Sequence, residues 1–477
     1  MSLTKKYIIK NPSLTLYAFH PRTDLAEEIS EDASLLWENL TKLIERLSAP
    51  NALKLSSKLL CYRNGQYDPS KEEGEKTAWL GLSEPRELTF SGQDFSGSVY
   101  PLRIHDTYTA DLTLFCKDKE MEVSQLSRLN PGACLMPSHI RASLGQTLLF
   151  YAEVPANESD VRKLADECLK ALLQDSNETL PPFVRKGRLF GSPVFEYEDY
   201  TYDPLERRHI LVWLCEHSRT PELAQTAYND LMTLFCCRNK ILYAFHQSRE
   251  SNKDARSLYM QLEKQIGKLD LKADPPERLK LMESLLAEMP PDEILYALHL
   301  RNLNDHRTTI KANIQNYKTS LEKIRALTLT DDDLSFFDEI LDLARKTFLF
   351  QIRTDLNILA PGQQLSQQII AGIRGIVEID TLRQLKDNGV VGIDTLRQLK
   401  ENEESGSARQ ERLEIVVTFI VAVLSGATLS ATVASAPKSF GDISHLSSMF
   451  FHIMFVGLGT GLIFLLIVII LQHFWRK

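Results

Sequence analysis

Two uncharged stretches near the C-terminus dominate the sequence: IVVTFIVAVLSGATLSATVASA at residues 415–436 and LSSMFFHIMFVGLGTGLIFLLIVIIL at residues 446–471. Each is longer than the ~20 residues that an α-helix needs to cross about 30 Å of hydrocarbon. The residues between them, 437–445, are enough for a turn only. The pattern therefore predicts two transmembrane helices joined as a hairpin.

The charges around these stretches predict their orientation. Arg409, Arg412, Arg476 and Lys477 flank the outer ends, whereas Lys438 is the one Lys or Arg in the turn. Cytoplasmic flanks carry the excess of Lys and Arg in membrane proteins. We therefore expect an integral membrane protein with two spans, contact with membrane lipid, and both termini in the cytoplasm.

The first stretch carries small and hydroxylated residues at helical spacing. Candidate pore-lining residues on one face are Thr418, Ser425, Thr428, Thr432 and Ser435. A water-filled pore in an oligomer would need such a face. Close packing between the two helices is the alternative, and its candidate contacts are Gly426, Gly457 and Gly461.

Residues 220–412 read as a long helical stalk. Thr220-Pro221-Glu222 is a good helix start, and Thr330 with Asp331–Asp333 starts another. Asp274-Pro275-Pro276, Pro290-Pro291 and Ala360-Pro361-Gly362 should interrupt the helices. Steps of four and three, typical of a coiled-coil seam, connect Ile310, Ile314, Tyr317, Leu321 and Ile324.

Residues 1–219 read as a mixed α/β domain. Strand patterns occur at 7–19, 112–115, 147–154, 193–197 and 209–215. Helical spacing occurs at 25–47 and 160–173. The predicted fold class is thus an α/β N-terminal cytosolic domain (1–219), a long helical, coiled-coil stalk (220–412) and a C-terminal two-helix transmembrane hairpin (413–477).

Composition and motifs exclude several functions. A net charge of −8 without a basic tract argues against a dedicated nucleic-acid binder. The seven cysteines are irregularly spaced, and no phosphate-binding loop, metal-ligand spacing or nucleophile motif is present. We expect no enzymatic activity, no cofactor and no metal, with a membrane-tethered enzyme of unfamiliar type as the less favoured alternative.

One turn of the N-terminal domain suits an anion. Arg185, Lys186 and Arg188 surround Gly187, whose backbone could approach a phosphate. A solvated hairpin turn is the competing interpretation. The acidic run at 196–200 should form an exposed loop nearby, and His209 should be a structural histidine.

The order of a cytosolic body, helical stalk, two C-terminal spans and basic tail resembles the layout of CorA-type divalent-cation channels. The Gly-Met-Asn tripeptide of that family is absent, since residues 435–441 read SAPKSFG, so no site residue is carried over. The resemblance implies a homo-oligomer, of which a pentamer is one form. Two functions follow as expectations: an oligomeric channel or membrane effector whose cytosolic domain senses a small-molecule or protein ligand, or a non-conducting membrane-anchored scaffold or sensor.

Overall fold

The computed structural model describes residues 6–23, 28–47, 53–72, 79–92, 94–116, 120–155, 160–176, 179–269 and 274–387. Contacts between residues divide the chain into two units, Met1–Val377 and Glu378–Lys477. The sheet and the packing of the long helices belong to the first unit. The predicted domain boundaries at 219/220 and 412/413 stay predictions.

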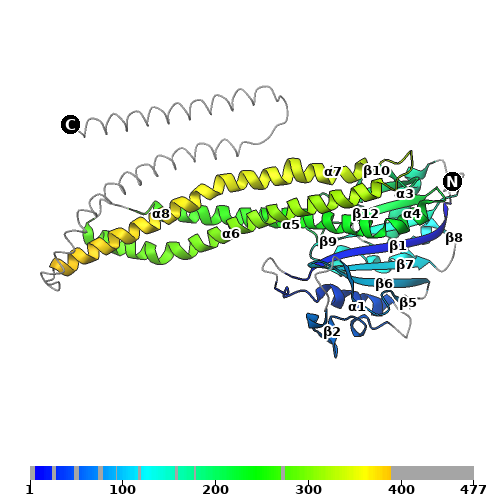
Figure 1. Ribbon diagram of the computed structural model, residues 1–477, viewed down its shortest axis with the longest axis horizontal. Helices are drawn as coiled ribbons and strands as arrows, with labels where there is room; N and C mark the ends of the chain where they lie inside the picture. The colour runs from blue at the N-terminus through cyan, green and yellow to red at the C-terminus, as the bar shows by residue number, and fades with distance from the viewer. Residues whose placement is uncertain are drawn as a thin grey trace, which may run out of the picture. The chain divides into compact units, whose positions relative to one another are not determined.

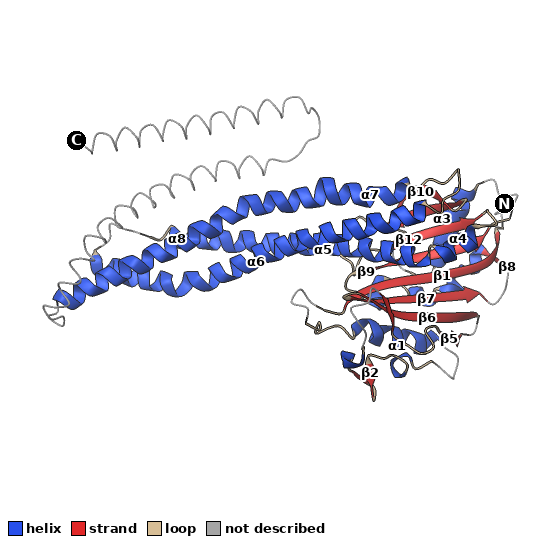
Figure 2. Ribbon diagram, in the orientation of Figure 1, coloured by secondary structure: helices blue, strands red, loops and turns tan. Residues whose placement is uncertain are grey.

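A mixed sheet of ten strands organises the N-terminal half (Figures 1 and 2). Its order is β10-β11-β12-β9-β1-β7-β6-β4, with β5 paired to β6 and β8 paired to β1. The β9–β12 pair is parallel and the other pairs are antiparallel. The strands are β1 Ile8–Pro21, β4 Trp79–Gly81, β5 Leu88–Ser91, β6 Phe95–Ile104, β7 Thr107–Cys116, β8 Glu120–Glu122, β9 Gly145–Glu153, β10 Phe183–Leu189, β11 Ser192–Glu198 and β12 His209–Cys215; β2 Tyr62–Arg63 and β3 Gln66–Tyr67 form a separate hairpin.

Helices cover both faces of this sheet, which explains why its central strands read as continuous apolar runs. One face packs a large apolar core beneath α1 Leu35–Leu47 and α3 Val161–Leu172. The short α2 Pro137–Ile140 lies against α1. On the opposite face, Phe235 of α5 packs against Tyr17 of β1, with ring centroids 5.4 Å apart. Side chains at alternate strand positions therefore face two different helical layers.

Long helices follow the sheet. These are α4 Thr220–Thr226, α5 Tyr228–Ile266, α6 Pro275–Arg325, α7 Ser335–Leu343, a π-helical turn at Ala344–Phe348, and α8 Leu349–Asp387. In Figure 2, α5, α6 and α8 run side by side away from the strands. All five residues of the predicted seam on α6 are buried, which confirms the heptad interpretation.

Three proline predictions have different outcomes. The interruption predicted at residues 274–276 is confirmed, because α5 ends at Ile266 and Pro275 and Pro276 begin α6, where prolines in a first helical turn are tolerated. The predicted interruptions at Pro290-Pro291 and at residues 360–362 are wrong, because α6 and α8 continue through them. Packing maintains the helices there: the Tyr296 hydroxyl donates to the Leu359 carbonyl at 2.7 Å. Gly362 allows close approach of a ring, since a Cβ on it would lie 2.5 Å from Tyr259.

The predicted transmembrane architecture is corrected. Across the described part of the chain, none of the helices combines the length with the apolar composition that a bilayer crossing requires. The long helices are not apolar along their length: charged residues occur throughout α5 and α6, and Arg238 and Asn239 are buried within α5. What the structure contains is a mixed ten-stranded sheet followed by long helices. The fold class with a transmembrane hairpin, the description as a transmembrane ion channel, and the two-span localisation with cytoplasmic termini are therefore withdrawn.

The residues on which that prediction was built lie outside the described residues. They are the two stretches 415–436 and 446–471, the pore-lining candidates Thr418, Ser425, Thr428, Thr432 and Ser435, and the packing candidates Gly426, Gly457 and Gly461.

Candidate functional site: a charged cavity between the sheet and the helices

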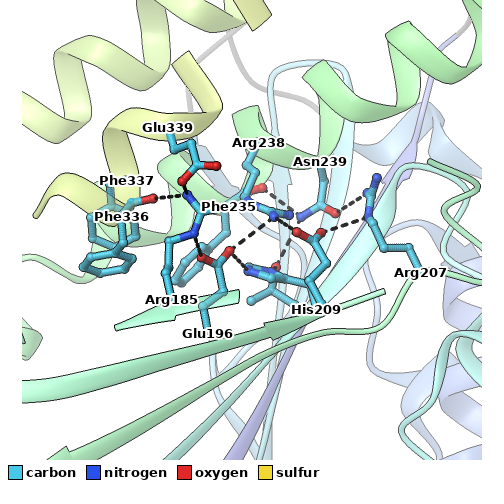
Figure 3. Close-up of polar contacts among 12 residues, drawn as sticks. Arg185, Glu196, Arg207, His209, Phe235, Arg238, Asn239, Phe336, Phe337 and Glu339 are labelled. Atoms are coloured by element: carbon cyan, nitrogen blue, oxygen red, sulfur yellow. Dashed lines mark hydrogen bonds and ion pairs between the residues drawn. The ribbon is translucent and has the colours of Figure 1, made fainter. Parts of the chain in front are cut away.

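A cavity of about 260 Å³ lies where the sheet meets the long helices. Its walls come from β10, β11, β12, the loop of residues 199–208, and helices α5, α6 and α7; we call it the junction cavity. Figure 3 shows the charged side chains that converge there from strands on one side and helices on the other. The cavity is thus built jointly by the two halves of the first unit.

Glu196 on β11 is the centre of a buried charge network. Its carboxylate lies 2.9 Å from Arg185 Nε, 3.0 Å from His209 Nε2 and 3.4 Å from Arg238 Nη2. Alternation along β11 turns Phe195 and Tyr197 into the apolar core and Glu196 toward the helices. The predicted exposed acidic loop at 196–200 is therefore wrong for Glu196, which is 5% exposed within a strand.

His209 is a neutral member of this network. Its Nε2 faces the Glu196 carboxylate, which can only accept, so Nε2 carries the proton. Its Nδ1 then accepts from the Thr147 hydroxyl at 2.9 Å, and Thr147 accepts from the Asn239 amide at 3.3 Å. Burial and the nearby Arg238 charge both lower the pKa of His209. The chain of donors from Asn239 to Glu196 is complete.

Glu198 joins two buried guanidinium groups. It accepts from Arg238 Nη2 at 2.6 Å and lies 3.6 Å from Arg207 Nε. Burial on its own raises the pKa of Glu198, but the guanidinium charges of Arg238 and Arg207 lower it to about 2. Glu198 is therefore ionised at neutral pH. Because its contact with Arg238 is shorter than its contact with Arg207, Glu198 pairs mainly with Arg238.

The Arg207 guanidinium packs directly against the backbone of Gly145, where a larger residue would leave no room for it. Its Nη2 donates to Asn239 Oδ1 at 3.1 Å. Gly145 has φ of +111°, and a Cβ on it would lie 2.7 Å from Asn239 Oδ1 and 3.1 Å from Arg207 Nη2. Only glycine satisfies both the backbone conformation and the close approach. Burial lowers the pKa of Arg207 to about 10, with a further contribution from Arg238.

Two guanidinium nitrogens at this cavity have unmet hydrogen-bonding capacity. Within the described residues, Arg207 Nη1 and Arg238 Nη1 are buried and have no hydrogen-bond partner. Both arginines line the junction cavity, and they are 2% and 7% exposed. Buried donors are normally satisfied, so an unpaired pair beside a cavity indicates that an acceptor belongs there.

The three cations predicted as an anion site are not brought together. They lie along β10 rather than in a turn, and each has its own partner. Arg185 pairs with Glu196 and with Glu339 of α7, and Lys186 lies 5.6 Å above the Phe195 ring on the other face. Arg188 donates to the Gly191 carbonyl at 2.6 Å. Of the three, only Arg185 reaches the junction cavity.

The turn after β10 does bind an anion, but it is a carboxylate of the chain itself. Asp332 accepts from the backbone N–H of Phe190 at 2.9 Å, of Gly191 at 2.7 Å and of Leu329 at 2.8 Å. Asp333 accepts from the backbone N–H of Ser335, the first residue of α7, at 2.9 Å. Asp332 therefore holds the sheet against the α6–α7 connection, and Asp333 binds the first N–H of α7, in line with the helix start predicted at these acids.

The arginines of this site were not predicted from the sequence. Arg238, Asn239 and Lys240 interrupt the apolar residues 234–237 (LFCC) and 241–242 (IL) of α5, and a polar insertion in such a run was the available signal. Arg207 gave no signal, because it follows a polar loop. Within the described ranges, no group of His, Cys, Asp or Glu is arranged to hold a metal ion.

No protein-family model, no curated protein and no solved structure matches this chain.

Proposed function

We propose that the chain is a ligand-responsive sensor, in which a small molecule in the junction cavity alters the position of α7 against the sheet. In this function the long helices carry the response. The predictions of self-association, of a CorA-type layout and of no enzymatic activity stay predictions.

The observation that supports a sensor is the shared construction of the cavity. Arg185 of β10 pairs with Glu339 of α7, and Arg238 of α5 pairs with Glu196 and Glu198 of β11. An occupant would compete with or reinforce contacts that connect the strands to the helices. Binding energy at this place can therefore bias the relative position of the two elements.

A route from the cavity into the helices is present. Phe336, Phe337, Ile340 and Leu343 of α7 line the cavity. The π-helical turn follows directly and ends at Phe348. A π turn accommodates one more residue than an α turn, which makes it a place where helical register can change at low cost.

The end of the π-helical turn is fixed by aromatic packing. The rings of Phe348 and Phe245 of α5 stack with centroids 3.9 Å apart, and Tyr202 of the 199–208 loop packs edge-on against both. The same loop lines the cavity. Movement of α7 would thus displace ring contacts with α5 and the start of α8.

The proposal is tested by screening a fragment library against the full chain by thermal shift, followed by hydrogen exchange on the hits. We expect hits to change exchange in residues 336–352. Leu343→Trp, which fills the cavity, should abolish binding. Leu295→Trp, at a position of α6 that is 46% exposed, is the matched control and should bind normally. Hits that bind Leu343→Trp as well as the wild type would refute a sensing role for this cavity.

A further inference from the structure

Arg207 is the least compensated charge in the junction cavity. It is 2% exposed, its one hydrogen bond to a side chain goes to the neutral Asn239, and its nearest ion-pair partner, Glu198, is 3.6 Å away. Within the described structure its Nη1 has no acceptor. A buried guanidinium without a close carboxylate is costly, so an additional acceptor there would be strongly favoured.

Arg238 presents a second donor to the same cavity. Its Nη2 is used by Glu198 at 2.6 Å and by Glu196 at 3.4 Å, and its Nη1 is unpaired among the described residues. The carboxylates of the cavity cannot meet this demand, because Glu196 is shared with Arg185 and His209. Glu196 Oε2, which also has no hydrogen-bond partner among the described residues, already faces Arg185 Nε at 2.9 Å as an ion pair.

The remaining wall is apolar and aromatic. Phe235, Tyr317, Phe336 and Phe337 line it, and the Tyr317 hydroxyl is already used, since it donates to the Phe337 carbonyl at 2.9 Å. The cavity volume of about 260 Å³ lies just below the roughly 300–1,000 Å³ of typical small-molecule sites, so a compact ligand suits it. A compact ligand with one anionic end and a flat apolar body fits both the chemistry and the size.

We propose that the junction cavity binds a small organic anion, a carboxylate or a phosphate, whose oxygens accept from Arg207 Nη1 and Arg238 Nη1. This assignment rests on the proposed sensor function and names its ligand class. A cation is disfavoured, because the carboxylates it would need are already paired with guanidinium groups. Bidentate geometry suits both carboxylate and phosphate oxygens.

Three probes of nearly equal shape test the charge requirement: benzoate, benzamide and benzamidine, which are anionic, neutral and cationic. Binding to the full wild-type chain is measured by ligand-observed NMR in a Tris buffer free of other organic anions. We expect benzoate to bind at least tenfold more tightly than either isostere. Equal or tighter binding of benzamide or benzamidine would overturn the anion assignment, and so would the absence of any benzoate or phosphate binding.

Phenyl phosphate and inorganic phosphate distinguish the two sources of the anion. Tighter binding of phenyl phosphate than of benzoate assigns a phosphate, and the reverse order assigns a carboxylate. Inorganic phosphate should bind more weakly than phenyl phosphate, because it leaves the aromatic wall without contacts. If it binds equally, the apolar body is not part of the ligand and that part of the assignment fails.

Variants connect the binding to the two arginines. Arg207→Lys keeps the charge but removes Nη1, and we expect it to weaken benzoate binding at least tenfold. Arg301→Lys is the matched control, since Arg301 of α6 is 68% exposed and does not line the cavity, and it should change binding less than threefold. Thermal melting verifies that each variant folds. If Arg207→Lys does not fold, the comparison of benzoate with benzamide and benzamidine on the wild-type chain tests the anion assignment by itself. Should benzamide bind and change exchange in α7, the sensor function stands and only the anion assignment fails.

Discussion

Asp332 should be the single most important surface-accessible carboxylate for joining the sheet to the helices. Its two oxygens accept three backbone N–H groups, at 2.9, 2.7 and 2.8 Å, from Phe190, Gly191 and Leu329. Replacing Asp332 with alanine leaves all three donors without their acceptor. Hydrogen bonds to a charged group are worth about 1.5–3 kcal/mol each when fully protected from water.

The expected loss is smaller than that full sum. Asp332 is only half-buried, so water can reach part of the site, whereas Phe190 is completely buried and its N–H lies deeper. We therefore expect Asp332→Ala to lower the free energy of unfolding by about 2–4 kcal/mol. Asp331→Ala is the matched control, because Asp331 is exposed, and it should change stability by less than about 0.5 kcal/mol.

Equilibrium urea unfolding of the full chain, followed by circular dichroism and by tryptophan fluorescence, measures the two variants side by side. The two probes report on the helices and on the sheet that contains Trp213. If Asp332→Ala and Asp331→Ala have the same stability, the carboxylate does not connect the sheet to the α6–α7 connection, and the account of that junction is wrong.

Two further predictions concern the cavity itself. Gly145→Ala should lower the free energy of unfolding by about 1–3 kcal/mol, because φ is +111° and the new Cβ would lie 2.7 Å from Asn239 Oδ1. Gly375→Ala is the control, because a Cβ on this helical glycine would meet nothing within 4 Å. It should leave the free energy of unfolding unchanged or raise it by up to about 1 kcal/mol. Urea unfolding that finds Gly375→Ala less stable than Gly145→Ala would contradict the packing of Arg207 against Gly145. The pKa of Glu198 is lowered from 4.5 to about 2, so its stabilising contribution, about 3 kcal/mol, is fully present above pH 4.5 and is lost as the pH falls toward 2. Glu198→Gln should have a lower free energy of unfolding than the wild type at neutral pH, and this difference should shrink below pH 4.5. The control Glu206→Gln changes an exposed carboxylate and should follow the wild-type dependence of stability on pH. If the loss of stability in Glu198→Gln does not depend on pH, the ion pairs of Glu198 are not its cause.

Local patterns predicted five of the ten strands of the sheet, β1, β7, β9, β11 and β12, and missed β4, β5, β6, β8 and β10. The apolar run at 209–215 coincides with β12 to the residue, and the helix predicted at 160–173 is α3, with Asp160 as its cap. The helix predicted at 25–47 is shorter, because α1 begins at Leu35. These elements were accessible because alternation and helical spacing depend on neighbours only a few residues away.

The long helices show where local rules fail. Prolines predict breaks, since they remove a backbone donor and crowd the preceding turn. In α6 and α8 that cost is offset by packing against other helices, as the buried Tyr296 and its bond to Leu359 show. The uncharged stretches after residue 414 dominated the predicted architecture, yet the arrangement of the described chain is decided by the sheet and by long helices that carry charged residues along their length.

What the sequence determined by itself is five strands of the sheet, β1, β7, β9, β11 and β12, and the buried seam of α6, because each follows from a short repeating pattern of apolar residues. Only the tertiary structure decided that Glu196, Glu198 and His209 share a buried site with Arg207 and Arg238. Whether a charged side chain is buried depends on the partners that reach it, and Arg238 comes from a helix about 40 residues away along the chain. Such a pairing stabilises ions away from water only once the strands and α5 have come together, so no local pattern records it.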